Sequence, residues 1–203
     1  MVTIDLNADL GEVFGRWALT DDEGLLDVAY RSVDSPVGPL LLGATEVGVV
    51  RVAFAAEGHD RVLEDLAARV SPRVLEAPRR LDAVASALEA YLAGRSHRVD
   101  VPVDLRLLAG YRREVVESLP SIGYGRTTTY AELAERTGRP RAVRAVGSAC
   151  ANNPVPLVLP CHRVVRSDGS EGGYRGGAEV KRLLLDLERG EAVHSCPEPR
   201  QGR

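Results

Sequence analysis

The stretch TTTYAELAERTGRPRAVRAVGSACAN, residues 127–152, decides the fold of the second half of the chain. Thr129 and Glu132 have the spacing of a capping box, which predicts a first helix that ends at Gly138. Pro140 is expected at the first position of a second helix, because no N–H is needed there. Two short helices joined by a tight, glycine-containing turn predict a helix-turn-helix, although plain helical hairpins share this pattern.

The segments on either side of this motif differ from it in character. YRREVVESL (111–119) predicts a helix that ends before Pro120. PVPLVLPCHRVV (154–165) is expected to be an extended strand, since its prolines and β-branched residues disfavour a helix. A glycine-rich loop, DGSEGGYRGG (168–177), then leads to a last predicted helix, AEVKRLLLDLERG (178–190).

The first half of the chain predicts a small α/β unit. YRSVDS (30–35), GPLLLGA (38–44) and GVVRVAF (48–54) have the composition of strands and are separated by turn residues. Two amphipathic helices are expected next, each with apolar residues at helical spacing. Their apolar stripes are Val62, Leu63, Leu66, Ala67 and Val70 in the first helix, and Leu81, Val84, Ala85, Leu88 and Leu92 in the second.

The composition is that of an ordinary globular protein, with 203 residues, of which 44% are apolar and 27% are charged. This length allows one large domain or two small ones. No run of about 18 apolar residues is present, which excludes a transmembrane helix, and the acidic N-terminus argues against a secretory signal. The three cysteines, Cys150, Cys161 and Cys196, lack the spacing of metal ligands. Their odd number favours the reducing cytoplasm over a disulfide framework or a structural zinc site.

Charge is distributed unevenly along the chain. Residues 1–105 carry 10 basic against 18 acidic residues, whereas residues 106–189 carry 14 basic against 9 acidic residues. Three of these arginines, Arg139, Arg141 and Arg144, come at the start of the second helix of the motif. A basic half on an acidic protein is typical of a protein that binds a polyanion. Arginines on solvated helix faces give the same composition, and charge alone does not separate the two interpretations.

Cys161, in PCHRVV (160–165), is the candidate for chemistry. A cysteine inside an apolar run is most often a small buried hydrophobic residue. A nucleophile is favoured by Pro160, which restricts the backbone, and by His162 and Arg163, whose positive charge is expected to lower the pKa of the thiol.

The last predicted helix adds a carboxylate, because Lys181, Leu184 and Glu188 fall on one of its faces. Glu188 is therefore a candidate to orient His162, directly or through water, as the third member of a nucleophile–base–orienter set. The alternative is that Glu188 is a solvated carboxylate near a helix end, and spacing alone favours that alternative.

The ungapped stretch from YGRTTTYAELAERTG to VKRLLLDLERG (124–190) resembles the C-terminal domain of the O6-alkylguanine-DNA alkyltransferases, or methylated-DNA–protein-cysteine methyltransferases. The motifs PCHRVV, RAVG, NPVP and GGYxGGxxxK carry the resemblance. YRSVDSPVGPLLLGATEVGVVRVAF (30–54) resembles, more loosely, the N-terminal domain of that family. The resemblance implies a small ribonuclease H-like α/β domain over 28–105 and a helical, winged-helix or helix-turn-helix-like domain over 106–190, followed by a flexible tail over 191–203.

The resemblance also implies a function. Cys161 would accept the alkyl group of O6-alkylguanine in DNA after base flipping, once and irreversibly, with O4-alkylthymine as a further candidate substrate. His162 would take the thiol proton through a water, and Glu188 would orient His162. Asn153 would hold the active-site turn. Tyr130 would rotate the target phosphate and donate its hydroxyl to guanine N3.

Further roles follow from the same resemblance. Arg144 would enter the base stack, with Arg141 and Arg163 as additional DNA contacts. Tyr174 would form a wall of the guanine pocket, the backbone of Cys161 and Val164 would accept from the guanine amino group, and Lys181 would support the site. The implied partner is alkylated double-stranded DNA, bound through its minor groove by a monomer, without a metal or an organic cofactor.

Departures from the family leave alternatives open. Arg175 follows Tyr174 where the family usually has a small residue, so the pocket size and the preferred alkyl group are open.

An alkyltransferase-like protein would bind the lesion without reacting, but such proteins lack the acceptor cysteine. A cysteine hydrolase that uses Cys161, His162 and Glu188 would need an oxyanion hole. A structural or redox thiol is the remaining alternative.

The leader MVTIDLNADLGEVFGRWALTDDEGLLD (1–27) stands apart, with seven acidic residues and one arginine. It resembles the opening strand of the LamB/YcsF (5-oxoprolinase) family, of which the rest of the fold is absent. A fragment of this size cannot form that active site, so no activity is assigned to it. We expect it to pack weakly on the N-terminal domain or to be disordered.

Overall fold

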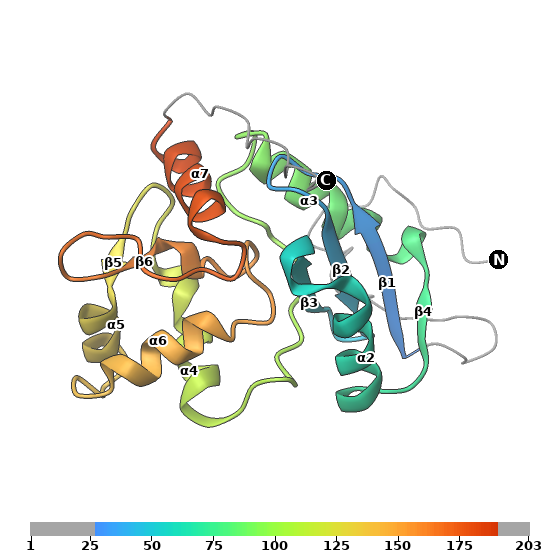
Figure 1. Cartoon of the computed structure of the whole chain (residues 1–203), viewed down its shortest axis with the longest axis horizontal. Coiled ribbons are helices and arrows are strands. Elements are labelled where there is room, and N and C mark those ends of the chain that lie inside the picture. Colours follow the sequence, from blue (N-terminus) through green and yellow to red (C-terminus); the bar gives the residue numbers. More distant parts are fainter. Residues whose placement is uncertain (1–26, 191–203) are drawn as a thin grey trace, which may run out of the picture.

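A computed structural model describes residues 27–190, in which a mixed sheet with its helices lies beside a largely helical part (Figure 1). This arrangement agrees with the predicted fold class, a small α/β domain followed by a helical domain. Except for Asp27, the predicted leader and its LamB/YcsF resemblance lie outside the described residues. The tail predicted over 191–203 lies outside them as well.

The sheet has the strand order β3-β2-β1-β4. Its first three strands are antiparallel neighbours, whereas β4 pairs with β1 in parallel. Strand β4 is not predicted from the sequence, because its three residues are too few to show an alternating pattern. The strands are β1 (Val28–Val33), β2 (Leu40–Ala44), β3 (Val49–Phe54) and β4 (Val74–Glu76).

Alternation along the strands gives the sheet two apolar faces. Leu41 faces the side covered by α2 (His59–Arg69), where it clusters with Val62 and Leu66. Leu40 and Leu42 face the opposite side, where they join one continuous core with α3 (Asp82–Leu92) and with the helical part of the chain. Because both faces are covered, β2 and β3 are buried over their whole length.

The helical part contains the predicted helix pair. Its elements are α4 (Gly110–Ser118), β5 (Thr128–Thr129), α5 (Tyr130–Arg136), α6 (Val143–Ala151), β6 (Val164–Val165) and α7 (Ala178–Arg189). The capping box is confirmed: Thr129 accepts from the amide of Glu132, whose carboxylate accepts from the amide of Thr129. Four short 3₁₀ turns are described in the two parts together. The sheet part contains η2 (Ala55–Glu57) and η3 (Pro78–Leu81), and the helical part contains η4 (Leu119–Ser121) and η5 (Cys161–Arg163).

The predicted start of the second helix of the motif is wrong. The helix α6 begins at Val143, and Pro140 lies in the preceding turn. That turn is closed by a bond of 2.8 Å from the amide of Ala142 to the carbonyl of Arg139. Proline is favoured at the second position of such a turn for the same reason as at a helix start, its fixed φ.

The strand predicted over residues 154–165 is also wrong for most of its length, because only Val164 and Val165 pair with β5. Leu157 has a φ of 72°, which a strand does not allow. The Asn153 side chain holds the segment instead, donating to the carbonyl of Leu159 at 2.8 Å and accepting from the amide of Val155 at 3.1 Å. Local side-chain bonds thus replace a β ladder.

A partly buried charge cluster joins the two parts of the molecule. Glu57, in η2, contacts Arg51 and lies 2.7 Å from Arg175 of the glycine-rich loop. Arg51 donates to the carbonyl of Pro154 at 3.2 Å, and Arg175 donates to that of Ala151 at 3.0 Å. One carboxylate therefore fixes both the end of α6 and the loop against the sheet.

Replacing Glu57 by alanine should lower the free energy of unfolding by roughly 3 kcal/mol, because it leaves the buried Arg51 guanidinium without its counter-charge. Urea denaturation measures the change. Glu89→Ala is the control: Glu89 pairs with Arg95, and both side chains are more than half exposed. That variant should lose less than about 1 kcal/mol, and an equal loss in the two variants would contradict the prediction.

Candidate active site

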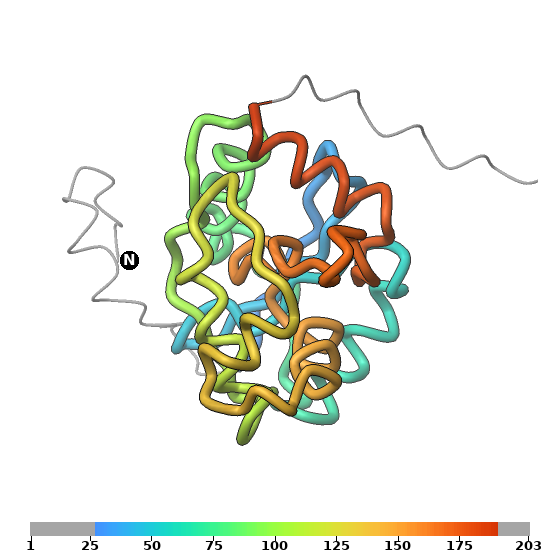
Figure 2. The backbone as a smooth tube through the Cα atoms, turned by 90° about the vertical axis from the view of Figure 1, so that its left-hand side faces the viewer, coloured from blue at the N-terminus to red at the C-terminus, as the bar shows by residue number. Residues whose placement is uncertain are grey.

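Cys161 is the first residue of η5, in the orange stretch between α6 and α7 that passes through the middle of the molecule (Figure 2). Its side chain is almost fully buried, and the thiol is free. The turn is held by the amide of Cys161, which donates to the carbonyl of Leu159 at 2.8 Å. The backbone thus fixes the thiol in the interior and away from bulk solvent.

The carboxylate of Glu188, in α7, lies at the centre of the site. Arg163 donates to it through Nε at 2.9 Å and through a terminal nitrogen at 2.8 Å. His162 Nε2 lies 2.9 Å from Oε1, and the amide of Gly125 donates to Oε2 at 3.1 Å. The alternative of a solvated Glu188 is wrong, because the carboxylate is buried and its oxygens accept from several groups.

Sequence reasoning missed Tyr91, a buried residue of α3. Its hydroxyl donates to Glu188 Oε1 at 2.6 Å and lies 3.2 Å from His162 Nε2. A tyrosine next to the apolar stripe of a helix signals a buried hydroxyl that needs a partner. The sequence does not reveal that this partner is 97 residues away.

The protonation states of Glu188 and His162 follow from the pKa of each side chain. Burial would raise the pKa of Glu188, but hydrogen bonds from His162 and Arg163 outweigh it and lower the pKa to about 2. Burial lowers the pKa of His162, although Glu188 opposes this. An ionised carboxylate only accepts, so a neutral His162 carries its proton on Nε2. Its Nδ1, which is buried without a partner among the described residues, then has a free lone pair.

The expectation that His162 and Arg163 lower the pKa of the thiol is wrong in direction. Burial raises the pKa of Cys161 above its ordinary value. A hydrogen bond from Asn153 and the positive charges of Lys181 and Arg175 act in the opposite direction on this pKa, but they do not outweigh burial. Cys161 is therefore a protonated thiol until a base removes its proton.

Lys181 and Asn153 are two further predicted residues that lie near the thiol. Lys181 is fully buried, and its ammonium donates to the carbonyl of Val164 at 2.7 Å and to that of Glu171. These two bonds join α7, β6 and the glycine-rich loop. Asn153 connects the end of α6 to the segment that carries Cys161, as described above.

Tyr174 is part of the glycine-rich loop, and Tyr130 of α5 contacts the same loop. The Tyr174 ring packs edge-on against Phe54 of β3, with centroids 5.5 Å apart, and its buried hydroxyl has no partner among the described residues. The Tyr130 hydroxyl lies against Gly172, where an added Cβ would come within 3.0 Å of it. Gly176 has a similar restriction, since a Cβ there would lie 2.9 Å from the Phe54 ring.

The predicted DNA contacts fall into two groups. Arg141 and Arg144 are exposed, just before and within the first turn of α6. Arg163 is buried, and its guanidinium binds Glu188 and the carbonyl of Ile122. The prediction of Arg163 as a DNA contact does not fit this placement.

The sequence leaves open whether Arg175 narrows the pocket. Its guanidinium binds Glu57 and the carbonyl of Ala151, which directs it toward the sheet.

Between residues 27 and 190, no group of three or more His, Cys, Asp or Glu side chains is arranged to hold a metal ion. None of the helices in this range has both the length and the apolar character needed to cross a membrane.

Family models match nearly all of the described chain. The model of the 6-O-methylguanine DNA methyltransferase ribonuclease-like domain matches residues 28–105. The model of the DNA binding domain of the same family matches residues 110–190.

Individual proteins agree with these matches. The methylated-DNA–protein-cysteine methyltransferase of Mycobacterium bovis is 36% identical over 173 residues, which cover 81% of this chain and 94% of that protein. The protein of the same name from Methanosarcina barkeri is 36% identical over 159 residues, 78% of this chain and 96% of that protein. A crystal structure of Mycobacterium tuberculosis OGT in complex with DNA superposes with a TM-score of 0.71 at 34% identity and covers 82% of this chain and 96% of that chain.

The lowered pKa of Glu188 predicts how stability depends on pH. Because the folded-state pKa lies below its ordinary value of 4.5, the ionised carboxylate stabilises the fold above that pH. This contribution should be lost as the pH falls from about 4.5 toward 2. Urea denaturation at several pH values in this window measures it.

The matched variant is Glu188→Gln, whose stability should change less with pH in that window. An equally steep dependence in both proteins would contradict the prediction. If the variant does not fold, titration of the Glu188 carboxyl carbon by NMR in the wild-type protein measures the same pKa. A value near 4.5 would then overturn the assignment.

Proposed function

The chain belongs to the 6-O-methylguanine DNA methyltransferase family, and from that premise we propose that it repairs alkylated DNA by transferring the alkyl group from guanine O6 to its own Cys161. The observation that carries this proposal is that the buried thiol of Cys161 is followed in η5 by His162, whose buried Nδ1 has no partner among the described residues. An oriented base beside a protonated thiol is what a nucleophilic substitution at carbon requires.

The proposed reaction begins with a proton transfer. His162 Nδ1 takes the proton of the Cys161 thiol through one water molecule, while Glu188 and Tyr91 hold the ring through its other side. The Sγ lone pair then forms a bond to the alkyl carbon as the bond from that carbon to O6 breaks. The electron pair of the broken bond passes to the guanine ring. The product thioether is not cleaved again, so each molecule reacts once.

Tyr130 is the proposed hydrogen-bond donor to N3 of the departing guanine. Burial raises the pKa of Tyr130, so its hydroxyl stays protonated and stabilises the negative charge on the guanine by donating a hydrogen bond to it. Its position against Gly172 supports this role, because it brings α5 next to the loop that contains Tyr174. The buried Tyr174 hydroxyl without a partner suits a wall of the guanine pocket.

The target carbon is stacked inside the duplex, so the nucleotide must be flipped out, which costs a few kcal/mol. We assign to Arg144, exposed at the start of α6, the role of filling the gap, and to Arg141 a contact with the backbone. Binding would occur through the minor groove, by a monomer, since one chain contains every residue of the site. The buried free thiols Cys150 and Cys161 favour a reducing cytoplasm.

Incubation with a duplex that contains one O6-methylguanine should add one methyl group to Cys161. The gain should equal one methyl per protein molecule and should not increase with excess DNA. Intact mass and peptide mapping measure it, with Cys161→Ser as the control that remains unmodified.

The other outcomes decide among the alternatives. Tight binding with an unchanged mass would indicate a protein that only recognises the lesion. Repeated turnover of a thioester or amide probe would indicate a hydrolase. Neither binding nor methyl gain would overturn the proposal.

The Arg144→Ala variant should repair duplex DNA roughly 10- to 100-fold more slowly, because it does not fill the gap left by the flipped base. Its reaction with the free base O6-methylguanine should be unchanged, since no flipping is required. Single-turnover rates with the two substrates measure the difference. Arg98→Ala, which removes an exposed arginine paired with Asp100 of the sheet domain, is the control. A parallel loss with both substrates would contradict this role.

A further inference from the structure

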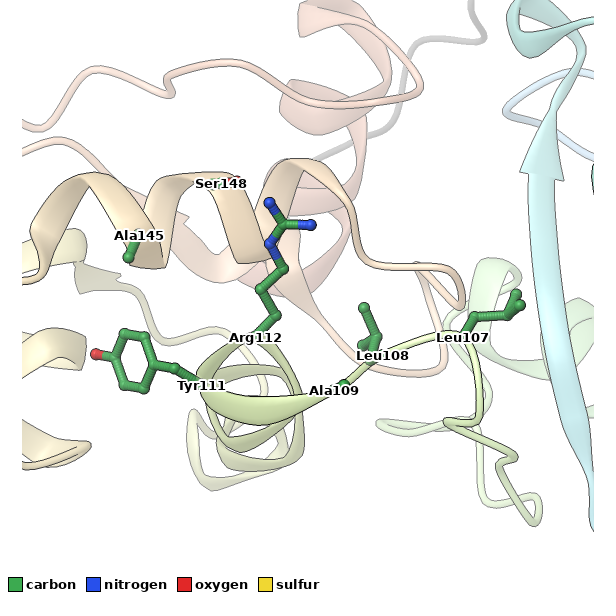
Figure 3. Close-up of a pocket in the computed structure, with 7 residues that line it drawn as sticks. All are labelled: Leu107, Leu108, Ala109, Tyr111, Arg112, Ala145 and Ser148. Atoms are coloured by element: carbon green, nitrogen blue, oxygen red, sulfur yellow. The ribbon is translucent and has the colours of Figure 1, made fainter. Parts of the chain in front are cut away.

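A basic groove lies where the two parts of the molecule meet, next to α6. Its larger section has a volume of about 470 Å³ and is lined by residues 107–109, by the first turn of α4 and by α6 (Figure 3). A smaller section of about 130 Å³ continues toward α2 and β3. The two sections share Leu107, Leu108 and Arg112 in their lining, so they lie next to each other.

The helix α6 and Asn152, which follows it, form one wall of the groove with short side chains. Ala145, Ser148 and Asn152 are spaced three and four residues apart, so they lie along one face. Arg144, the residue proposed to enter the base stack, immediately precedes this stripe and is exposed. The groove therefore starts at the edge of the surface proposed to contact the lesion.

The charge of the groove is positive. Its smaller section is lined by Arg51, Arg69, Arg112 and Arg175, against the single carboxylate of Asp65. Glu57 binds Arg51 and Arg175, and Asp65 lies 3.1 Å from Arg69.

Arg112 differs from the other three arginines. It has no hydrogen bond or ion pair to any residue that the structure describes. Figure 3 shows its side chain extending from α4 toward Ser148 of α6. A guanidinium in this position, without a counter-charge, is free to bind an anion from outside the chain.

We propose that this groove binds the phosphodiester backbone of the DNA strand that runs away from the flipped nucleotide, and that Arg112 contacts one of its phosphates. The inference rests on the proposed function, because it takes DNA as the ligand of α6. The small side chains of the α6 wall let a sugar–phosphate chain approach the helix. An arginine binds phosphate through two parallel hydrogen bonds, which fixes the position of the strand.

Continuity with α6 favours a DNA strand over a free anion. A free phosphate needs only one positively charged group for binding. This groove extends from α6 to α2, which is the shape expected for a site that binds several consecutive phosphates of a strand. Arg69, half exposed on α2, lies at the far end, so the sheet domain would also contact DNA. This extends the DNA-binding surface beyond the helix pair.

The test compares two neighbouring arginines of α4. Arg112→Gln and Arg113→Gln remove the same charge from the same helix, but Arg113 pairs with Glu117 at 2.8 Å and does not line the groove. Binding to an O6-methylguanine duplex is measured from 50 to 200 mM salt in a Cys161→Ser background, so that no transfer consumes the protein. Arg112→Gln should weaken binding about five-fold and reduce the slope of log K against log salt by about 0.9.

Arg113→Gln should leave both quantities nearly unchanged, and Arg112→Lys should recover most of the slope. A second series replaces single phosphates of the duplex by uncharged methylphosphonates. One position on one strand should weaken binding of the parent protein and have no further effect on Arg112→Gln. Equal slopes for the two glutamine variants, or no position coupled to Arg112, would overturn the inference.

The failure of the inference and that of the proposed function give different results. If the wild-type protein gains a methyl group on Cys161 but the two glutamine variants bind DNA alike, only the inference fails. If the Arg112-dependent slope is present but no methyl is gained, the proposed transfer fails and the groove remains a DNA site. Inorganic phosphate that competes at millimolar concentration while no methylphosphonate has an effect would indicate a free-anion site and overturn the inference.

Discussion

The reaction centre depends on one buried carboxylate. Glu188 brings together His162 and Arg163 from η5, Tyr91 from α3 and the amide of Gly125 from the loop before β5. A buried negative charge is stable only where hydrogen-bond donors surround it. The buried carboxylate of Glu188 therefore depends on all of these groups. The contacts of Glu188 with His162 and Tyr91 are therefore also among those that join the sheet domain to the helical domain.

The sheet domain consequently contributes to the candidate site, although Cys161 and its neighbours lie in the helical part. Tyr91 reaches the base from α3, and Phe54 of β3 supports the ring of Tyr174. Glu57 holds the loop and the end of α6 through Arg175. These contacts explain why residues of two domains are needed to position one thiol. They also place the groove at the boundary between the domains, where charges from both are close together.

Much of this arrangement could be predicted from the sequence, because periodicity and capping are local signals. The strands β1 to β3, helices α2 to α7 and the box of Thr129 and Glu132 follow from such signals. Contacts between distant residues do not: the partner of Tyr91, and the burial of Arg163, depend on tertiary structure. The strand predicted around Cys161 failed because Asn153 gives the backbone other hydrogen bonds. The pKa of Cys161 had the wrong predicted direction, because sequence proximity to positive residues is not proximity in space and burial outweighs charge.

The burial of Cys161 has a consequence for a protein that reacts only once. Peroxides and other small oxidants attack thiolates that solvent can reach, and the damage advances from sulfenic to irreversible sulfonic acid. A thiol that is 4% exposed and keeps its proton is a poor target for them. In the proposed reaction this interior position makes Cys161 depend on His162 for activation, and the same position protects the thiol from oxidation before it reacts. Each molecule can thus wait in the cell, chemically intact, until a lesion is presented to it.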